Sequence, residues 1–459
     1  MNEKLTYKKE TVYKKAGKDI TAAAFEYADG YKKFLDAAKT EREAVKAAIS
    51  MLEARGFKEY ALGDRISKGD RLYYNNRGKN LFAFAIGSED IKNGLRITAS
   101  HVDAPRIDLK QCPLYEDGGM AYFKTHYYGG VRKYQWVATP LALHGVVVTK
   151  DGRSIDVAVG ENDEDPIFYI SDLLPHLGRE QSKLPLSDAI KGEQLNVLLG
   201  NIPSNDDDAS VKSAILSLIN EKYGICEEDF FSSELCVVPA AKARDIGFDR
   251  SMIGAYGHDD RVCAYPSLTA MLEALDSGCE HSIMCVLADK EETGSDGASG
   301  MKSDLFLDII NEIARELGSS GAIIRANSKC LSADVSAGFD PNFPDVYEKL
   351  NSAFVGCGAI FTKYTGGGGK SSTNDANPEF IAWLRAAMDE YGVVWQSAEL
   401  GKVDAGGGGT VAKYIAGHNI ETIDLGVAVI SMHAPYEVVA KSDVYETHRA
   451  IKAFYCFNR

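Results

Sequence analysis

The second half of the chain alternates between short apolar runs and amphipathic runs, and this alternation limits the possible folds more than any other feature. SIMCVLAD and IETIDLGVAV have the composition of buried strands. AYPSLTAMLEALDSG, LFLDIINEIARELG and DVYETHRAIKAFYCF carry apolar residues at three- and four-residue steps, as helices do. Strands that alternate with helices build a mostly parallel central sheet with helices on its faces. The sequence therefore predicts an α/β fold of this kind.

The first hundred residues are expected to join the same sheet. The stretch 20–56 has helical periodicity and ends in a glycine, which predicts one helix. LFAFAIGS and LRITAS follow as two short buried strands, and the second leads directly into His101.

The segment from about 110 to 200 differs from its surroundings. MAYFKTHYYGG, YQWVATPLALHGVVVTKDG and SIDVAVG are aromatic and β-branched runs between turn signals, which predict antiparallel strands and hairpins. A loop through NIPSNDDDAS and a helix at VKSAILSLINEKYG are expected after them. We therefore predict an inserted β-rich domain at 109–245, within a larger domain made of 1–108 and 246–459.

The composition excludes several classes of function. With 51 Lys and Arg against 66 Asp and Glu, the chain has a formal net charge of −15, which argues against nucleic acid or an anionic membrane as a partner. The N-terminus lacks the apolar core of a secretory signal, and no apolar stretch approaches the roughly 20 residues that span a bilayer. Nine scattered cysteines without a CxxC pair predict reduced thiols and a cytoplasmic location.

Five short segments hold most of the unusual polar residues, and four of them directly follow a predicted strand. They are SHVDAP, GHDDR, DKEETGS, SADVSAG and SMHAPYE. Catalytic groups in open α/β sheets gather at the carboxyl ends of the strands, so residues distant in the chain can meet in one crevice. Imidazoles and carboxylates without cysteine suit Zn²⁺, Mn²⁺ or Co²⁺.

The set contains enough ligands for two divalent ions about 3.5–4 Å apart. We predict that Asp259 bridges them, that His101 and Asp334 complete the ligands of one ion, and that Glu292 and His433 complete those of the other.

Two further acidic residues are assigned supporting roles. Neighbouring side chains at a strand end point in different directions, so Glu292 can bind metal while Glu291 faces the attacking water as general base. Asp103, two residues after His101, is predicted to accept the second N–H of that imidazole.

Each motif taken alone has a simpler explanation. A single histidine or a Glu-Glu pair is usually a surface feature, and GHDDR fits a helix N-cap with a local salt bridge. TGGGGKSST resembles a phosphate loop, but Tyr364 stands where that motif needs glycine, and no buried strand is expected before it. No G-x-S-x-G motif for serine catalysis occurs.

The five motifs in this order resemble the aspartyl aminopeptidase family, metallopeptidase family eighteen, and the resemblance covers nearly the whole chain. It implies a zinc exopeptidase fold and a two-zinc enzyme that removes one N-terminal residue from peptides. Carried over by position, its metal ligands are His101, Asp259, Glu292, Asp334 and His433, and its general base is Glu291. These are the residues assigned above from chemistry.

The resemblance also implies an assembly. The family's insert drives dimerisation, and its dimers form a closed dodecamer in which an insert histidine reaches a neighbour's active site. His176, in DLLPHL, is the corresponding histidine here.

The chain departs from the aspartyl enzymes at GHDDR and at YTGGGGKSST. These departures favour a bacterial-type branch with a preference for basic or neutral residues. Lys370, in the second segment, is a candidate for binding a substrate carboxylate or carbonyl, beside the simpler explanation of a flexible surface lysine.

The sequence thus predicts a zinc aminopeptidase that acts on peptides with a free N-terminus. Two alternatives remain: another two-metal hydrolase, such as a carboxypeptidase or deacylase, and a scaffold protein with a degenerate site.

Overall fold

The computed structural model describes residues 5–205 and 210–458, which form two compact units. The first unit contains the chain up to Asp103, Ala243–Met432 and the chain from Glu437 onward. The second contains Ala104–Lys242 together with His433–Tyr436. The sequence placed the inserted domain at 109–245, and that functional division stays a prediction. Part of its predicted loop, 206–209, lies outside the described residues.

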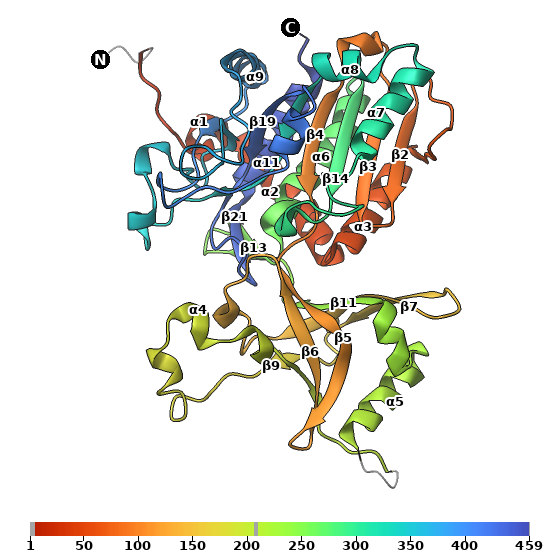
Figure 1. The fold of residues 1–459 in the computed structure, drawn as a ribbon. Coiled ribbons are helices and arrows are strands. Elements are labelled where there is room, and N and C mark those ends of the chain that lie inside the picture. The colour runs from red at the N-terminus through yellow and green to blue at the C-terminus, as the bar shows by residue number, and fades with distance from the viewer. Residues whose placement is uncertain (1–4, 206–209, 459) are drawn as a thin grey trace. The chain divides into compact units, whose positions relative to one another are not determined.

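The first unit is built on a nine-stranded sheet (Figure 1). Its strands in spatial order are β1 (Lys58–Glu59), β2 (Arg71–Asn76), β3 (Asn80–Ala85), β14 (Ile283–Ala288), β4 (Arg96–His101), β15 (Lys329–Ser332), β19 (Glu421–Gly426), β17 (Ala359–Thr362) and β18 (Trp395–Ser397). The central strands β14, β4, β15 and β19 are all parallel to their neighbours within this group. The prediction of an α/β fold with a mostly parallel sheet is confirmed.

Helices cover both faces of this sheet because its central strands are apolar on both sides. Along β14, Cys285 and Leu287 belong to one hydrophobic cluster and Met284 and Val286 to the other, as the two-residue period of a strand requires. One cluster packs beneath α3 (Glu41–Glu53), α6 (His258–Asp276), α9 (Pro378–Glu390) and α11 (Lys441–Cys456). The other packs beneath α7 (Leu305–Glu316), α8 (Gly321–Asn327) and α10 (Ala412–Ala416) (Figure 1).

The N-terminal helical region differs from the prediction. The single helix expected over 20–56 is wrong: α1 (Val12–Lys15) is followed by α2 (Gly17–Ala37), and α3 begins as a separate helix. Thr40 causes the break, because its side chain accepts a hydrogen bond from the Glu43 backbone while the Glu43 carboxylate accepts one from the Thr40 backbone. This capping box starts a new helix inside a continuous periodic pattern.

Two small sheets complete the first unit. One is formed by β12 (Arg244–Ile246), β13 (Met252–Ala255) and β21 (Glu437–Ala440), and the other by β16 (Ser336–Ala337) and β20 (Ala428–Val429). The buried strand β17 directly precedes the glycine-rich segment at 366–369, so the expectation that no buried strand comes before it is wrong. Tyr364 still breaks the phosphate-loop pattern.

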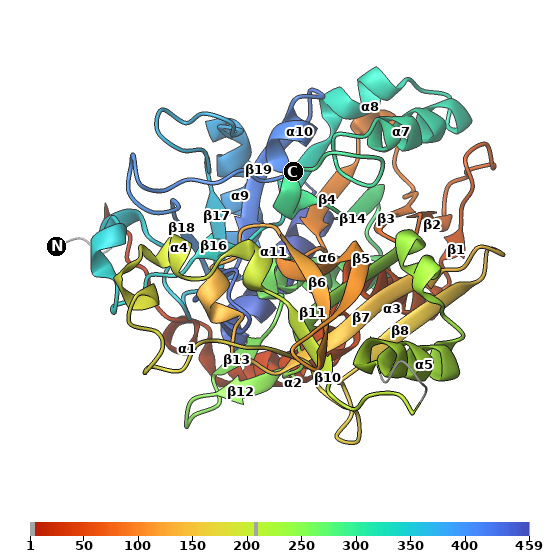
Figure 2. The same ribbon diagram turned by 60° about the horizontal axis from the view of Figure 1, so that its bottom comes forward.

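The second unit is a seven-stranded antiparallel sheet, and Figure 2 shows its strands β5, β6, β7 and β11. The strands in spatial order are β8 (Ser154–Val159), β7 (Leu141–Val148), β11 (Ser233–Pro239), β5 (Arg106–Asp117), β6 (Met120–Tyr128), β10 (Val197–Gly200) and β9 (Tyr169–Ile170). Within the described residues, this unit contains two α-helices, the short α4 (Leu186–Ala189) and α5 (Val211–Tyr223), which packs on β6. Across the described ranges of both units, no helix is long and apolar enough to cross a membrane.

Candidate active site

The last residue of β4 brings the first candidate ligand to the carboxyl edge of the nine-stranded sheet. His101 is only 2% exposed, and its Nε2 lies 3.0 Å from Oδ1 of Asp259. Its Nδ1 lies 3.0 Å from the backbone oxygen of Asp103 and 3.2 Å from Oδ1 of the same residue. The Nδ1 side of the ring is therefore held by Asp103, and the Nε2 side faces the acidic cluster.

Asp103 also orients the segment that carries the glutamate pair. Its Oδ1 accepts a hydrogen bond from the backbone N–H of Glu291, and its Oδ2 accepts one from that of Glu292, both at 3.2 Å. The pair lies in a single 3-10 turn, Glu291–Thr293, shortly after β14. Since β14 is parallel to β4, both segments leave the sheet at the same edge. One buried carboxylate thus links the imidazole to both glutamates.

Two adjacent aspartates enter from the start of α6. Asp259 and Asp260 have non-helical backbone angles and are joined by a cis peptide bond. The Asp259 N–H donates to the Glu437 carboxylate at 3.1 Å, and Oδ2 of Asp260 accepts from the His101 N–H at 3.3 Å. The regular helix therefore begins after the two aspartates, whose side chains reach the His101 end of β4.

Two groups of side chains converge closely enough to hold a cation. Ligand atoms of His101, Asp259 and Glu292 all lie within 4.8 Å of one another, and so do those of His101, Asp260 and Asp334. Asp334 follows β15, the strand next to β4. The grouping differs from the predicted one, which placed Glu292 and His101 on different ions and left Asp260 out. The assignment of ligands to particular ions stays a prediction.

The electrostatics of the cluster favour a bound cation. Burial is the largest cause that raises the pKa of both Asp260 and Asp334 well above the usual range; nearby acidic charges add to it, and the charge of His101 opposes it. Burial alone would lower the pKa of His101, but its hydrogen bonds to Asp103 and Asp259 raise it well above the ordinary value. Buried carboxylates of one sign destabilise each other unless a positive charge compensates them.

The residues present fit divalent cations. Oδ1 of Asp260 is buried and has no hydrogen-bond partner among the described residues. The converging atoms are imidazole nitrogen and carboxylate oxygen, the donors that Zn²⁺ and similar ions accept in sites that retain an open position. A buried carboxylate oxygen that has no hydrogen-bond partner and lies in an acidic cluster is typical of an atom that binds a metal ion.

His433 belongs to the second unit. Its Nδ1 lies 2.9 Å from the carbonyl oxygen of Gly130, and a side chain at Gly130 would crowd the ring, because its Cβ would lie 3.1 Å from Nδ1. Engagement of Nδ1 by a carbonyl is the usual arrangement when Nε2 is the metal-binding nitrogen. The role of His433 as a ligand stays a prediction.

The two predicted substrate residues occupy different settings. His176 is exposed, in a turn of the second unit. The Lys370 ammonium lies 2.9 Å from the Asp375 carboxylate and 3.8 Å from the centre of the Tyr364 ring, so it would have to exchange these partners to bind a substrate. Both roles stay predictions.

His258, next to the aspartates, is a core residue. It is fully buried, its Nδ1 lies 2.8 Å from the Tyr31 hydroxyl, and its Nε2 lies 3.2 Å from the Ile253 carbonyl oxygen. Burial lowers its pKa to about 3, so the ring is neutral. The sequence did not single it out as a ligand, and its ring is used in packing.

Sequence analysis missed two residues of the cluster. Asp260 was visible in GHDDR, but only one aspartate of the pair was given a role. Glu437 lies at the start of β21 and is 1% exposed, yet it accepts the hydrogen bond from Asp259. Its only signal was its place in SMHAPYE, four residues after His433.

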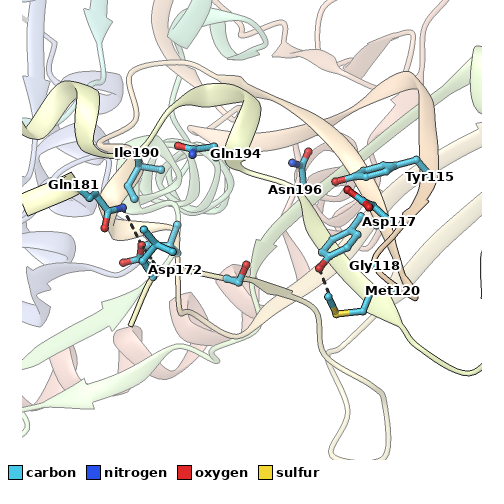
Figure 3. Close-up of a pocket in the computed structure, with 13 residues that line it drawn as sticks. Tyr115, Asp117, Gly118, Met120, Asp172, Gln181, Ile190, Gln194 and Asn196 are labelled. Carbon is cyan, nitrogen blue, oxygen red and sulfur yellow. Dashed lines mark hydrogen bonds between the residues drawn. The ribbon is translucent and has the colours of Figure 1, made fainter. Parts of the chain in front are cut away.

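A separate cavity of about 470 Å³ lies within the second unit (Figure 3). Tyr115 and Tyr122 line it with their stacked rings, and Asp172 and Gln181 line it at a point where the two side chains hydrogen-bond. None of the predicted site residues lines it.

A match to a known protein family agrees with the convergence of possible metal ligands described above. The model of the family described as Aminopeptidase I zinc metalloprotease (M18) matches residues 34–455. The chain belongs to the M18 family of zinc aminopeptidases. It is thus a hydrolase that acts on peptide bonds.

Individual relatives place this M18 aminopeptidase on the bacterial side of the family. It is 50% identical over 440 residues to a Clostridium acetobutylicum protein named "Probable M18 family aminopeptidase 1", with 94% of each chain covered. A protein of Ricinus communis named as an aspartyl aminopeptidase is 25% identical over 464 residues, covering 92% of this chain and 93% of the relative.

Solved structures agree with these relatives. The M18 aminopeptidase of Thermotoga maritima has a TM-score of 0.93 at 42% identity, with 98% of this chain and 99% of that chain covered. The Saccharomyces cerevisiae mApe1 dodecamer has a TM-score of 0.76 at 21% identity, covering 94% and 96%, which shows a shared fold.

Proposed function

We propose that this M18 aminopeptidase uses two divalent ions, most suitably Zn²⁺, and that Glu291 is its general base. The observation that supports this most strongly is the position of Asp103, whose carboxylate holds both the His101 ring and the backbone of the Glu291–Glu292 pair. A network that fixes an imidazole and two glutamates at one sheet edge is what a preorganised hydrolytic site requires.

The ligands proposed from the structure and the sequence are His101, Asp259, Glu292 and Asp334, with His433 retained from the sequence. Asp259 is the proposed bridge: its Oδ1 already lies against His101, and its backbone is held by Glu437. Asp260, which shares a group with His101 and Asp334, is an additional candidate that either binds an ion directly or supports the ligands.

Bound ions would supply Lewis-acid polarisation of the scissile carbonyl and of the attacking water. The protein's own side chains carry out proton transfer and positioning. Glu291, which is only partly buried, takes the proton of the water at a carboxylate oxygen and returns it to the leaving amine. Asp103 keeps the turn that carries Glu291 fixed to the imidazole, so the base does not have to be ordered when substrate binds.

The main rival is another two-metal hydrolase, a carboxypeptidase or a deacylase. A panel of amino-acid anilides, tested with free and with blocked α-amino groups and with and without chelator, separates the two. We expect hydrolysis only of the free amines and only without chelator. Hydrolysis of the blocked compounds at equal rate would contradict the aminopeptidase proposal. The same panel reports whether acidic, basic or neutral residues are preferred.

We further propose that the second unit mediates assembly into dimers and, from these, a dodecamer. The segment around His176 carries Leu173, Leu174 and Leu177, which are 52%, 50% and 70% exposed. Exposed apolar side chains so close together are typical of a surface that another chain covers. Light scattering coupled to size-exclusion chromatography gives the mass directly, and replacing these three leucines by serine should lower it. A native mass of about one chain would contradict the proposal.

A further inference from the structure

Two cysteines of the first unit, distant in sequence, meet at the end of the chain. Cys279 lies just after α6, and Cys456 is the last residue of α11. Sγ of Cys279 lies 3.1 Å from the carbonyl oxygen of Tyr455, the residue directly before Cys456. Both thiols are partly exposed and pack against the same hydrophobic cluster.

The other cysteines offer no comparable arrangement. Cys112 and Cys226 are exposed, and five others are buried: Cys236, Cys263, Cys285, Cys330 and Cys357. Cys226 donates to the Asp229 carboxylate, and this contact raises the pKa of its thiol, which keeps it protonated.

Cys279 also has a path to solvent. It lines an open pocket of about 540 Å³ together with Lys68 and Arg71, and with Gly69, Gly87 and Gly278, which present no side chain. Glu280 is the acidic residue of this lining. A volume of this size accommodates a small peptide-like reagent. The positive charges of Lys68 and Arg71 would attract a reagent that carries carboxylates.

Access from the pocket makes Cys279 the first of the two to react, because Cys279 lines the pocket and Cys456 is not among its lining residues. The direction of the pKa shifts agrees with this order. The pKa of Cys279 is lowered, first by a hydrogen bond with the Cys456 thiol and further by the His281 backbone and the Arg96 guanidinium, against the opposite effect of burial. The pKa of Cys456 is raised, first by its hydrogen bond to Cys279. The thiolate is the reactive form in disulfide exchange, so the first attack falls to Cys279 and the second to Cys456.

We propose that Cys279 and Cys456 form a reversible redox pair in which Cys279 reacts first with a small anionic disulfide, such as oxidised glutathione, and Cys456 resolves the adduct. In the first step the Cys279 thiolate attacks one sulfur of the reagent, which forms a mixed disulfide and releases one glutathione thiolate. In the second step the Cys456 thiol loses its proton and its sulfur attacks Cys279, which forms the Cys279–Cys456 disulfide and releases the second glutathione. The protein loses two electrons, and the reagent gains them as two thiols.

The disulfide would tie the carboxyl ends of α6 and α11 together. The regular part of α6, residues 261–276, is about 24 Å long, and Asp259 lies before its other end. The cross-link is therefore remote from the catalytic cluster. It closes a long loop of the chain, which stabilises the folded state mainly by restricting the unfolded one.

The full-length metal-loaded protein, first reduced, should be incubated with excess oxidised glutathione and digested without reductant. We expect mass spectrometry to find the Cys279 peptide joined to the Cys456 peptide. In C456S, the glutathionyl adduct should accumulate on Cys279. In C279S the Cys279–Cys456 cross-link cannot form, and Cys456 should take up glutathione more slowly than Cys279 does in C456S.

The melting temperature and the turnover measure the effect of the Cys279–Cys456 disulfide. The cross-linked protein should melt at a higher temperature than the reduced protein, dithiothreitol should reverse the difference, and turnover should be unchanged. C112S serves as the matched control, because it removes an exposed thiol outside the pair and should behave as wild type. Adducts that appear on Cys112 and Cys226 without a Cys279–Cys456 cross-link would overturn the proposal. So would a cross-link that forms equally fast in C279S through another thiol.

Discussion

Oδ1 of Asp103 lies 3.2 Å from Nδ1 of His101, and both residues are almost completely buried. The same carboxylate accepts the backbone N–H groups of Glu291 and Glu292, so it joins a candidate metal ligand to the candidate base. The arrangement predicts a positioning role for Asp103.

Replacing Asp103 with asparagine should weaken metal affinity or turnover by about 10–100-fold, the usual cost of losing such a partner. The amide keeps the size of the side chain but replaces one of the two accepting oxygens with an NH2 group, which faces a backbone N–H and cannot accept from it. Metal titration and kcat/KM measure the two effects. The matched control is Asp108→Asn, a partly exposed aspartate of the second unit, which should leave both values unchanged. Wild-type values for the Asp103 variant would contradict the role.

Glu291→Gln should keep the metal content and lower turnover by about 10²–10⁴-fold, because an amide cannot take a proton from water. Glu292→Gln should instead reduce the metal content, since Glu292 belongs to a converging group of ligand atoms. Elemental analysis and anilide hydrolysis, performed on both variants, separate the base from the ligand. If Glu291→Gln retained full turnover, this residue would be removed from the mechanism.

Removing the metal should destabilise the protein as well as inactivate it. The carboxylates of Asp260, which is buried, and of Asp334, which is partly buried, then lose their compensating charge, and ligand binding to the folded state is lost. A site filled at 100 times Kd contributes about 2.7 kcal/mol of stability. Scanning calorimetry should show a lower melting temperature in chelator that rises again when Zn²⁺ is returned in excess. An unchanged melting temperature would speak against a metal among these residues.

The ion pairs of Glu273 should stabilise the fold only above acidic pH. Its carboxylate lies 2.6 Å from Nε2 of His448 and 2.6 Å from Nζ of Lys452, and these contacts, that with His448 first, lower its pKa from 4.5 to about 2. A carboxyl group whose pKa is lower in the folded state contributes stability above its unfolded pKa and loses it as the pH falls. The stability gap between wild type and Glu273→Gln should therefore be full above pH 4.5 and close toward pH 2.

Urea denaturation at a series of pH values measures this gap. Glu26→Gln, on the exposed side of α2, is the control and should show no gap that varies over this range. A gap that stays constant from neutral pH to pH 2 would contradict the assignment.

A second glycine tract, 406–409, packs closely against the tract at 366–369. Gly407 has φ +109°, and a Cβ there would lie 2.4 Å from the Cα of Gly367, while the Gly408 N–H donates to the Thr365 carbonyl. Gly407→Ala should therefore destabilise the protein by about 1–3 kcal/mol through backbone strain and overlap. Gly408→Ala is the matched control, because a Cβ there meets nothing within 4 Å. Equal stability of the two variants, measured by denaturation, would contradict the packing argument.

Alternation of apolar strands and amphipathic helices was sufficient to predict the fold, because a sheet that is apolar on both faces has few other ways to bury its surface. The position of polar residues after strands likewise pointed to His101, Glu292 and Asp334, since parallel strands end at a common edge. Asp259 lies instead at the start of α6. The periodic pattern predicted helix boundaries less well. The pattern is unbroken over 20–56, but the capping box at Thr40 starts a separate helix there.

Only the tertiary structure decided which carboxylates lie close to the His101 imidazole. Sequence spacing does not distinguish Asp259 from Asp260, because the direction of each side chain depends on the backbone angles where α6 begins. It gives no sign that Glu437 holds the Asp259 backbone, since that contact depends on strand β21 pairing with β13. The contact between the Cys279 and Cys456 segments arises in the same way, from helix ends that meet only after the sheet and its helices have packed.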